Sequence, residues 1–109
     1  MILEVATLDV KAGQEAAFEK DFAGASHIIE GIPGYISHQL LHCLEKANRY
    51  VLLVRWETLE AHTIGFRKSP HYQTWKDALH HYYDPFPTVE HYALPASAEE
   101  IAVPRIELE

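Results

Sequence analysis

The residues of this chain that are best suited to chemistry lie between positions 55 and 72, where the sequence reads RWETLEAHTIGFRKSPHY. The spacing predicts a helix with one face made of Leu59, His62, Thr63 and Phe66. An imidazole titrates near neutral pH, so His62 on the apolar side of a helix could act as a general base toward a small organic molecule. The alternative interpretation is a partly buried histidine that is hydrogen-bonded to a backbone carbonyl.

His71 is the second candidate, because it follows the Ser69-Pro70 step that predicts the start of the next helix. In the first turn of that helix, its side chain or the neighbouring amides could face a substrate oxygen. As a purely structural element, the same Ser-Pro-His step is simply a good helix start. Tyr72 and Trp75 then begin an apolar stripe, which is either the wall of a pocket or ordinary core.

Charged and titratable residues also occur in the expected strands. His38 and His42 share one strand face but lie about 13 Å apart, too far to bind one metal ion, so no metal site is expected. His38 could contact a ligand if its face lines the pocket, or a partner chain if it does not. Glu4 and Arg55 interrupt apolar strands, and buried charges are usually paired, so a mutual salt bridge is expected. A polar anchor in the pocket is the alternative for them.

The order of elements predicts one α+β domain with the ferredoxin-like split βαβ arrangement and an antiparallel sheet. Apolar periodicity and turn residues predict strands at 2–10, 35–44, 49–56 and 88–94, and helices at 14–32, from 58, and at 69–81. The domain therefore covers 1–94. Residues 95–109 show no lasting periodicity and are expected to form a separate extension, either an arm on a partner or a loose tail.

The apolar pattern of one expected strand predicts a partner chain. Val51 to Val54 is apolar on both faces, whereas the helices of one chain can cover only one face of the sheet. Packing of two sheets against each other is the simplest cover, so a homodimer through the open sheet face is expected.

Composition excludes several classes of partner. The formal net charge of −7 and the nine scattered Lys and Arg argue against nucleic acid and anionic membrane surfaces. No apolar run approaches the roughly 20 residues that a membrane span needs, and the N-terminus lacks the features of a signal peptide. Cys43 is the only cysteine and cannot form an internal disulfide, which favours a reducing cytoplasm.

Three motifs carry a family resemblance: PGY at 33–35, RWE at 55–57 and KSPHY at 68–72. With them, residues 1–94 resemble the antibiotic biosynthesis monooxygenase domain, a family of dimeric α+β barrels. The resemblance is specific for the fold and weak for the activity, because the family includes anthrone and quinol oxygenases, haem-degrading enzymes and an isomerase-like branch.

The haem-degrading branch differs from this chain at three places. That branch has an Asn on the first strand, a Trp before the Ser-Pro step and an axial His on the helix after it. This chain has Ala6 or Thr7, Phe66 and Lys76 there. Haem degradation is therefore not expected, because the iron would lack that ligand.

The remaining resemblance implies a monooxygenase that needs no cofactor and acts on a small aromatic, quinol-like or anthrone-like compound. A base removes a proton from the substrate, and the resulting anion reacts with dioxygen. The expected catalytic residues are His62 and His71, and the expected substrate contacts are His38, Phe66, Tyr72 and Trp75. The alternatives are an isomerase or a non-catalytic module that binds a small molecule, and a purely structural dimer with a collapsed interior.

Overall fold

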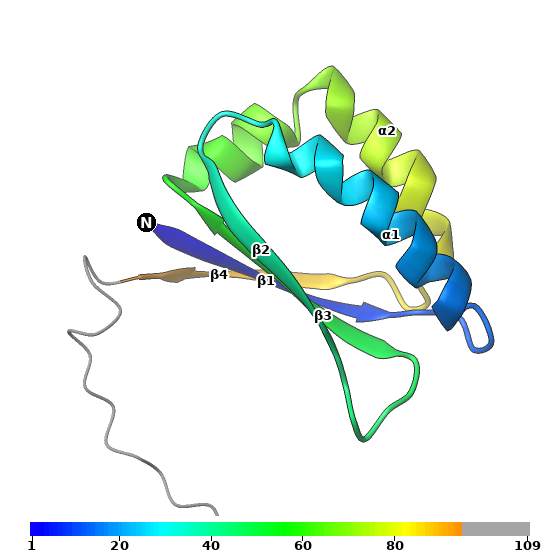
Figure 1. Ribbon diagram of the computed structural model, residues 1–109. Coiled ribbons are helices and arrows are strands. Elements are labelled where there is room, and N and C mark those ends of the chain that lie inside the picture. The colour runs from blue at the N-terminus through cyan, green and yellow to red at the C-terminus, as the bar shows by residue number, and fades with distance from the viewer. Residues whose placement is uncertain (95–109) are drawn as a thin grey trace, which may run out of the picture.

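The computed structural model describes residues 1–94, which form a four-stranded antiparallel sheet with helices on one face (Figure 1). The elements are β1 (Ile2–Asp9), α1 (Glu15–Glu30), β2 (Tyr35–His42), β3 (Arg49–Trp56), the π-helical segment η1 (Ala61–Phe66), α2 (Pro70–Leu79), the short 3₁₀ segment η2 (His80–Tyr82) and β4 (Thr88–Ala93). The strand order is β2-β3-β1-β4, which confirms the predicted ferredoxin-like α+β fold. The expected extension at 95–109 lies outside the described residues.

Residue parity along β1 decides which side chains meet the helices. Glu4, Ala6 and Leu8 are buried beneath the helical layer, whereas Val5 and Thr7 are half-buried on the other face. Successive side chains of a strand point to opposite faces, so the even-numbered residues of β1 form one row. This row carries a carboxylate, Glu4, into the space between sheet and helices.

The two charges expected to pair lie on opposite faces of the sheet, so the predicted Glu4–Arg55 salt bridge is wrong. Glu4 is opposite Val54 in the antiparallel register, and Arg55 is opposite Leu3. Arg55 therefore belongs to the exposed face, where it lines a hollow beside Leu53. Glu4 belongs to the helix-covered face.

Strand β3 is apolar on both faces, as predicted, but only one face is covered by this chain. Leu52 and Val54 are buried under the helices, whereas Val51 and Leu53 are half-buried on the open face. Figure 1 shows both helices on the same side of the sheet, with no element of residues 1–94 on the other side.

A bulge near the start of β2 breaks the predicted alternation of that strand. The register with β3 shifts between Tyr35 and Ser37, so Ile36 has no partner and is 43% exposed. Ile36 therefore lies outside the ladder, whereas simple alternation along residues 35–44 would place it on the same face as His38.

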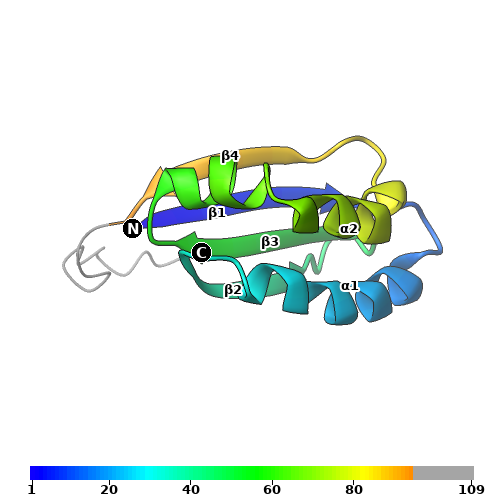
Figure 2. The same cartoon turned by 90° about the horizontal axis from the view of Figure 1, so that it is seen from above.

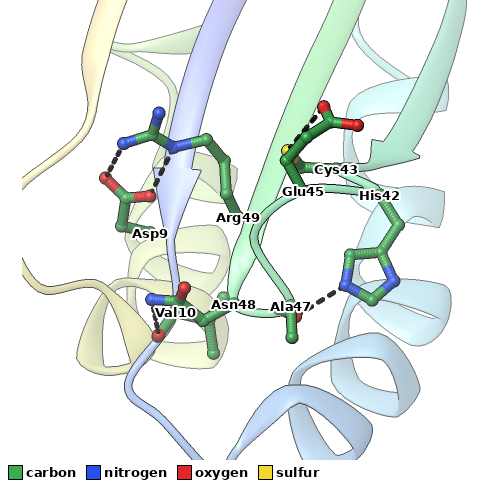
Figure 3. A network of polar contacts seen from close by, with 8 residues as sticks. All are labelled: Asp9, Val10, His42, Cys43, Glu45, Ala47, Asn48 and Arg49. Atoms are coloured by element: carbon green, nitrogen blue, oxygen red, sulfur yellow. Dashed lines mark hydrogen bonds and ion pairs between the residues drawn. The ribbon is translucent and has the colours of Figure 1, made fainter.

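Polar contacts at the far end of the sheet fix the register of β3 against β1 (Figure 3). The Arg49 guanidinium donates to both carboxylate oxygens of Asp9, at 2.8 and 3.2 Å, and these two residues are directly opposite in the ladder. The Asn48 side chain donates to the carbonyl of Val10 at 3.1 Å. A slip of one residue would break both contacts and would turn Glu4 to the open face.

The helices pack through the predicted apolar stripe of α1. Phe18, Phe22 and Ile29 are buried, and Phe18 contacts the ring of Tyr50 at a centroid distance of 5.0 Å. The start of α2 at Pro70 is as predicted, although the Ser69 hydroxyl makes no capping hydrogen bond. Within residues 1–94 no helix is both long and apolar enough to cross a membrane.

Candidate functional site

A cavity of about 370 Å³ lies between the helical layer and the sheet. Its size is within the range of small-molecule sites in proteins, and its presence argues against a collapsed, purely structural interior. Leu52, Val54 and Trp75 contribute apolar walls, while Glu4 and His62 bring titratable groups to the same space.

Segment η1 carries His62 into this cavity. The Arg67 N–H donates to the His62 carbonyl five residues back, at 3.1 Å, which is the wide π-helical pattern. His62 and Phe66 are each 3% exposed, whereas Leu59 of the predicted face is 39% exposed. The segment begins as expected, because the Thr58 hydroxyl accepts a hydrogen bond from the Ala61 N–H at 3.1 Å.

Four side chains meet at the inner end of η1, and they come from four different elements or their ends. The Trp56 indole N–H donates to Glu4 Oε1 at 2.9 Å. His62 Nε2 lies 3.4 Å from the same oxygen, and its Nδ1 lies 2.8 Å from Nε2 of His91. The His62 ring also stacks on Trp56, with centroids 5.3 Å apart. We call these four residues the Glu4 cluster.

The topology explains why the Glu4 cluster forms. Glu4 on β1 is directly opposite His91 on β4 in the antiparallel register, so both point into the helix-covered space. Figure 2 shows the helical turn after β3 lying over this pair of strands. His62 is thereby placed between Glu4 and His91.

Burial shifts the pKa values in the Glu4 cluster in the direction that favours the uncharged form of each titratable side chain. Desolvation raises the pKa of Glu4, and the Trp56 hydrogen bond and the Arg67 charge oppose this shift. Desolvation, with the nearby Arg67 and His91, lowers the pKa of His62 to about 3. Burial, and then the charge of Arg67, lower the pKa of His91. His62 is therefore a neutral imidazole at physiological pH.

A second titratable group lines the cavity away from the Glu4 cluster. The half-buried His80 packs against the rings of Tyr72, Tyr83 and Phe86, with centroids 5.5 to 6.1 Å apart. Burial, and then the charge of Lys76, lower its pKa. His80 was not among the predicted site residues, because a histidine in the last turn of the predicted helix at 69–81 is explained by the helix dipole.

The structure brings together four of the six predicted site residues. His62, Phe66, Tyr72 and Trp75 all line the cavity. His71 does not: it is exposed on α2, because neighbouring helical residues are rotated by about 100° and Tyr72 takes the inward position.

His38 is also absent from the cavity. It lies on the helix-covered side of β2, but its ring packs against Phe22 of α1 at 6.1 Å, and its Nδ1 is 2.6 Å from the Tyr35 hydroxyl. His38 is not among the residues that line the cavity, so its position does not indicate a direct ligand contact.

Besides His80, three polar groups at or next to the cavity were missed or given another role: Glu4 and Arg67 line the cavity, and His91 contacts His62. Glu4 was expected in a salt bridge, with the pocket only as the alternative, and His91 and Arg67 gave no signal. The parity of β1 could have placed Glu4 on the buried face. The position of His91 depends on which strand pairs with β1, which no local pattern reveals. No group of three or more His, Cys, Asp or Glu in the described part of the chain could hold a metal ion.

Residues 1–78 match the model of the antibiotic biosynthesis monooxygenase family. The chain belongs to this family. The Bacillus subtilis (strain 168) protein YczJ, which is uncharacterized, is 54% identical over 92 residues, covering 84% of this chain and 97% of YczJ. A mycobilin-producing haem oxygenase of Mycobacterium tuberculosis is 33% identical over 60 residues, or 55% of this chain and 57% of the enzyme.

Solved structures of family members share the fold. A Bordetella bronchiseptica protein assigned to the antibiotic biosynthesis monooxygenases has a TM-score of 0.82 and 32% identity, covering 86% of this chain and 96% of that one. SnoaB, a cofactor-independent oxygenase from Streptomyces nogalater, has a TM-score of 0.75 and 22% identity, covering 88% of this chain and 94% of SnoaB. At that identity the likeness to SnoaB shows the fold alone.

The haem-degrading branch of the antibiotic biosynthesis monooxygenases is a poor match at the cavity. Lys76, at the place where the resemblance puts the axial histidine, is not a lining residue, and its ammonium lies 5.9 Å from the ring centroid of Tyr72. Phe66 occupies the place of the tryptophan. The residues present therefore do not reproduce the haem site.

Proposed function

We propose that this family member is a cofactor-independent monooxygenase that acts on a small aromatic compound of the hydroquinone or anthrone type. The observation that carries the proposal is the mainly apolar cavity with a buried carboxylate and imidazole at one place in its wall. For an anthrone the balance is simple: a CH₂ group becomes a carbonyl with one oxygen atom of O₂. The other oxygen atom leaves as water with the two hydrogens.

The cavity offers what such a reaction needs from a protein. Phe66, Tyr72 and Trp75 give aromatic walls that suit a flat substrate and exclude water. The Glu4 cluster supplies a buried carboxylate whose pKa is raised, which makes it a stronger base than a carboxylate in water. Arg67 also lines the cavity, and its positive charge would stabilise the substrate anion.

The proposal includes a homodimer through the open sheet face. Leu3, Val5 and Leu53 are half-buried there, on a face that no element of residues 1–94 covers. Pairing two such faces would bury these side chains and would leave the helix-covered cavity of each protomer intact.

An isomerase is a second candidate, and one observation favours it. The Glu4 cluster can move a proton, and nothing in that step requires dioxygen. A module that binds a small molecule without turnover would use the same cavity. Oxygen consumption separates the monooxygenase from both alternatives.

The test is oxygen uptake by the purified, metal-stripped protein with a panel of hydroquinones and anthrones, with His62→Ala measured alongside. We expect uptake to survive metal removal and to fall at least about tenfold in the variant, since His62 belongs to the Glu4 cluster, which is proposed to accept the substrate proton. His71→Ala is the matched control, because His71 is exposed and outside the cavity.

Two results would contradict the proposal. No uptake above the uncatalysed rate with any compound would leave the isomerase and the binding module. A Soret shift on titration with haemin that disappears in His80→Ala would instead indicate a haem protein that uses His80, the other histidine lining the cavity.

A further inference from the structure

We propose that Glu4, rather than His62, accepts the proton of the substrate, and that His62, Trp56 and His91 act as positioning residues for its carboxylate. The inference rests on the proposed function for the identity of the substrate, but the proton transfer itself can be tested without turnover. In this step the O–H or acidic C–H bond of the substrate breaks. Its electron pair stays on the substrate, and the proton binds to a Glu4 oxygen.

The two carboxylate oxygens of Glu4 have different surroundings. Oε1 accepts the Trp56 indole N–H at 2.9 Å and lies 3.4 Å from His62 Nε2. Oε2 has no hydrogen-bond partner among residues 1–94. It is also not among the polar side-chain atoms of these residues that are both inaccessible to solvent and without a partner, so part of its surface is accessible. Since Glu4 lines the cavity, Oε2 is the oxygen left open to a ligand.

His62 is poorly placed to be the base, although it lies at the same site. Its Nδ1 is engaged by His91 at 2.8 Å, and its Nε2 is directed at Glu4. One face of its ring is covered by Trp56, with the two rings inclined by 17°. Both nitrogens thus face protein groups, at 2.8 and 3.4 Å, whereas one oxygen of Glu4 has no hydrogen-bond partner among residues 1–94.

The contacts of His62 instead suit a group that orients Glu4. When Glu4 is ionised, the favourable tautomer of His62 carries its proton on Nε2, toward Oε1. His62 Nδ1 then accepts the N–H of His91 Nε2, so His91 selects this tautomer. The Trp56 N–H donates to Oε1 and His62 Nε2 lies 3.4 Å from it, so both groups face Oε1 and leave Oε2 toward the ligand.

The groups around Glu4 act on its pKa in opposite directions. The groups that face it are His62 on η1, His91 on β4, Trp56 on β3 and the cation Arg67 after η1. Burial raises the pKa of Glu4 while the Trp56 hydrogen bond and Arg67 moderate the rise. A carboxylate whose pKa is raised in this way is a stronger base than one in water.

The first experiment compares Glu4→Gln with His62→Gln in steady-state oxygen uptake. The Gln amide oxygen can still accept the Trp56 N–H, so the cluster keeps one of its contacts. We expect kcat to fall roughly 100-fold or more in Glu4→Gln with KM little changed, and to fall less in His62→Gln. Glu45→Gln, on the exposed hairpin after β2, is the control. Equal or greater loss in His62→Gln would overturn the assignment.

The pH profile tests the positioning residues separately. The acid limb of kcat/KM reports the ionisation of the base in the free enzyme. Removing the Trp56 hydrogen bond, which lowers the pKa of Glu4, should move this limb to higher pH in Trp56→Phe. Admitting water in His62→Ala should move it to lower pH, because desolvation is the main cause of the raised pKa. Limbs that stay in place in both variants would contradict the proposal.

A ligand that does not turn over separates this inference from the proposed function. We expect 4-nitrophenol to bind the wild-type protein as the visible-absorbing phenolate at a pH where the free probe is mostly protonated. Glu4→Gln should bind it as the neutral phenol. A phenolate band that persists in Glu4→Gln would exclude Glu4 as the acceptor even if oxygen uptake is found. A band lost in Glu4→Gln without any oxygen uptake would support Glu4 and contradict only the monooxygenase.

Glu4→Gln must be folded for these comparisons, which its circular dichroism and melting temperature will show. If it is not, Glu4→Asp serves in its place. This variant keeps a carboxylate but withdraws it by one methylene, so we expect phenolate formation to survive with a slower kcat. Loss of the phenolate band in a folded Glu4→Asp protein, with the same loss in His62→Gln, would point to His62 instead.

Discussion

His62 is held as a neutral imidazole in the interior, so its protonation is coupled to unfolding. Its pKa is lowered to about 3 in the folded chain, against an ordinary value of about 6.5. Between these two values the unfolded chain binds more protons than the folded one, and stability therefore falls as the pH decreases. Glu4 has the opposite sign: its raised pKa adds stability as the pH falls toward its ordinary value.

We predict that the wild-type protein loses about 1–3 kcal/mol of unfolding free energy between pH 7 and pH 4 through His62. Urea unfolding at several pH values measures this loss, and His62→Gln should show a clearly shallower dependence. His71→Gln, which alters an exposed histidine, serves as the control and should follow the wild type. Parallel curves for His62→Gln and the wild type would show that His62 is not buried in its neutral form.

At the scale of elements, the turn before β2 and the start of η1 fit closely together. Gly34 has a φ of +91°, and a Cβ added there would lie 2.6 Å from the Cβ of Ala61. The Glu57 N–H donates to the Gly34 carbonyl at 2.8 Å, which ties the end of β3 to the same turn. The position of η1, and with it of His62, therefore depends on the absence of a side chain at residue 34.

Gly34→Ala should destabilise the protein by about 2–4 kcal/mol, because it adds both backbone strain and a steric clash. Gly24→Ala is the matched control: Gly24 lies within α1, no atom approaches its Cβ position within 4 Å, and alanine favours helices by about 1 kcal/mol. Thermal unfolding should thus shift in opposite directions for the two variants. Equal melting temperatures would mean that the turn and η1 are not in contact in solution.

The regular elements could be predicted from the sequence, because each has its own periodicity. The stripe from Phe18 to Ile32 and the alternation in β1 specify a helix and a strand without tertiary information. The bulge at Ile36 was missed because it depends on a single extra residue in β2. The outward orientation of His71 was missed because a shift of one position along a helix is enough to turn a side chain away from the cavity. The Glu4 cluster was only partly accessible: His62 could be found from its helix, but its contact with His91 requires the pairing of β4 with β1.

At the scale of the whole molecule, β3 contributes apolar side chains to both faces of the sheet. Leu52 and Val54 face the cavity, while Val51 and Leu53 lie on the face proposed to meet a second protomer. A dimer would therefore support the cavity wall from behind without contributing to its lining in this arrangement.

We predict that Leu53→Glu converts the proposed dimer to a monomer in light scattering coupled to size-exclusion chromatography. A carboxylate is costly to bury in an apolar interface, and a symmetric interface would bury one from each protomer. Leu44→Glu is the control, since Leu44 is 94% exposed beyond the end of β2. A wild-type protein that is monomeric at micromolar concentration would contradict the proposed dimer outright.

The π-helical form of η1 has a consequence for how this chain is compared with its relatives. A π-helical turn is commonly equivalent to an α-helix that has gained one residue. An ungapped alignment with a relative that has an ordinary α-helix there would place residues before the insertion one position out of step. A histidine equivalent to His62 would then stand in a neighbouring column of the alignment, and its apparent absence would be an alignment error. Alignments of this segment should therefore be anchored separately at Trp56 and at Pro70, with one gap allowed between them.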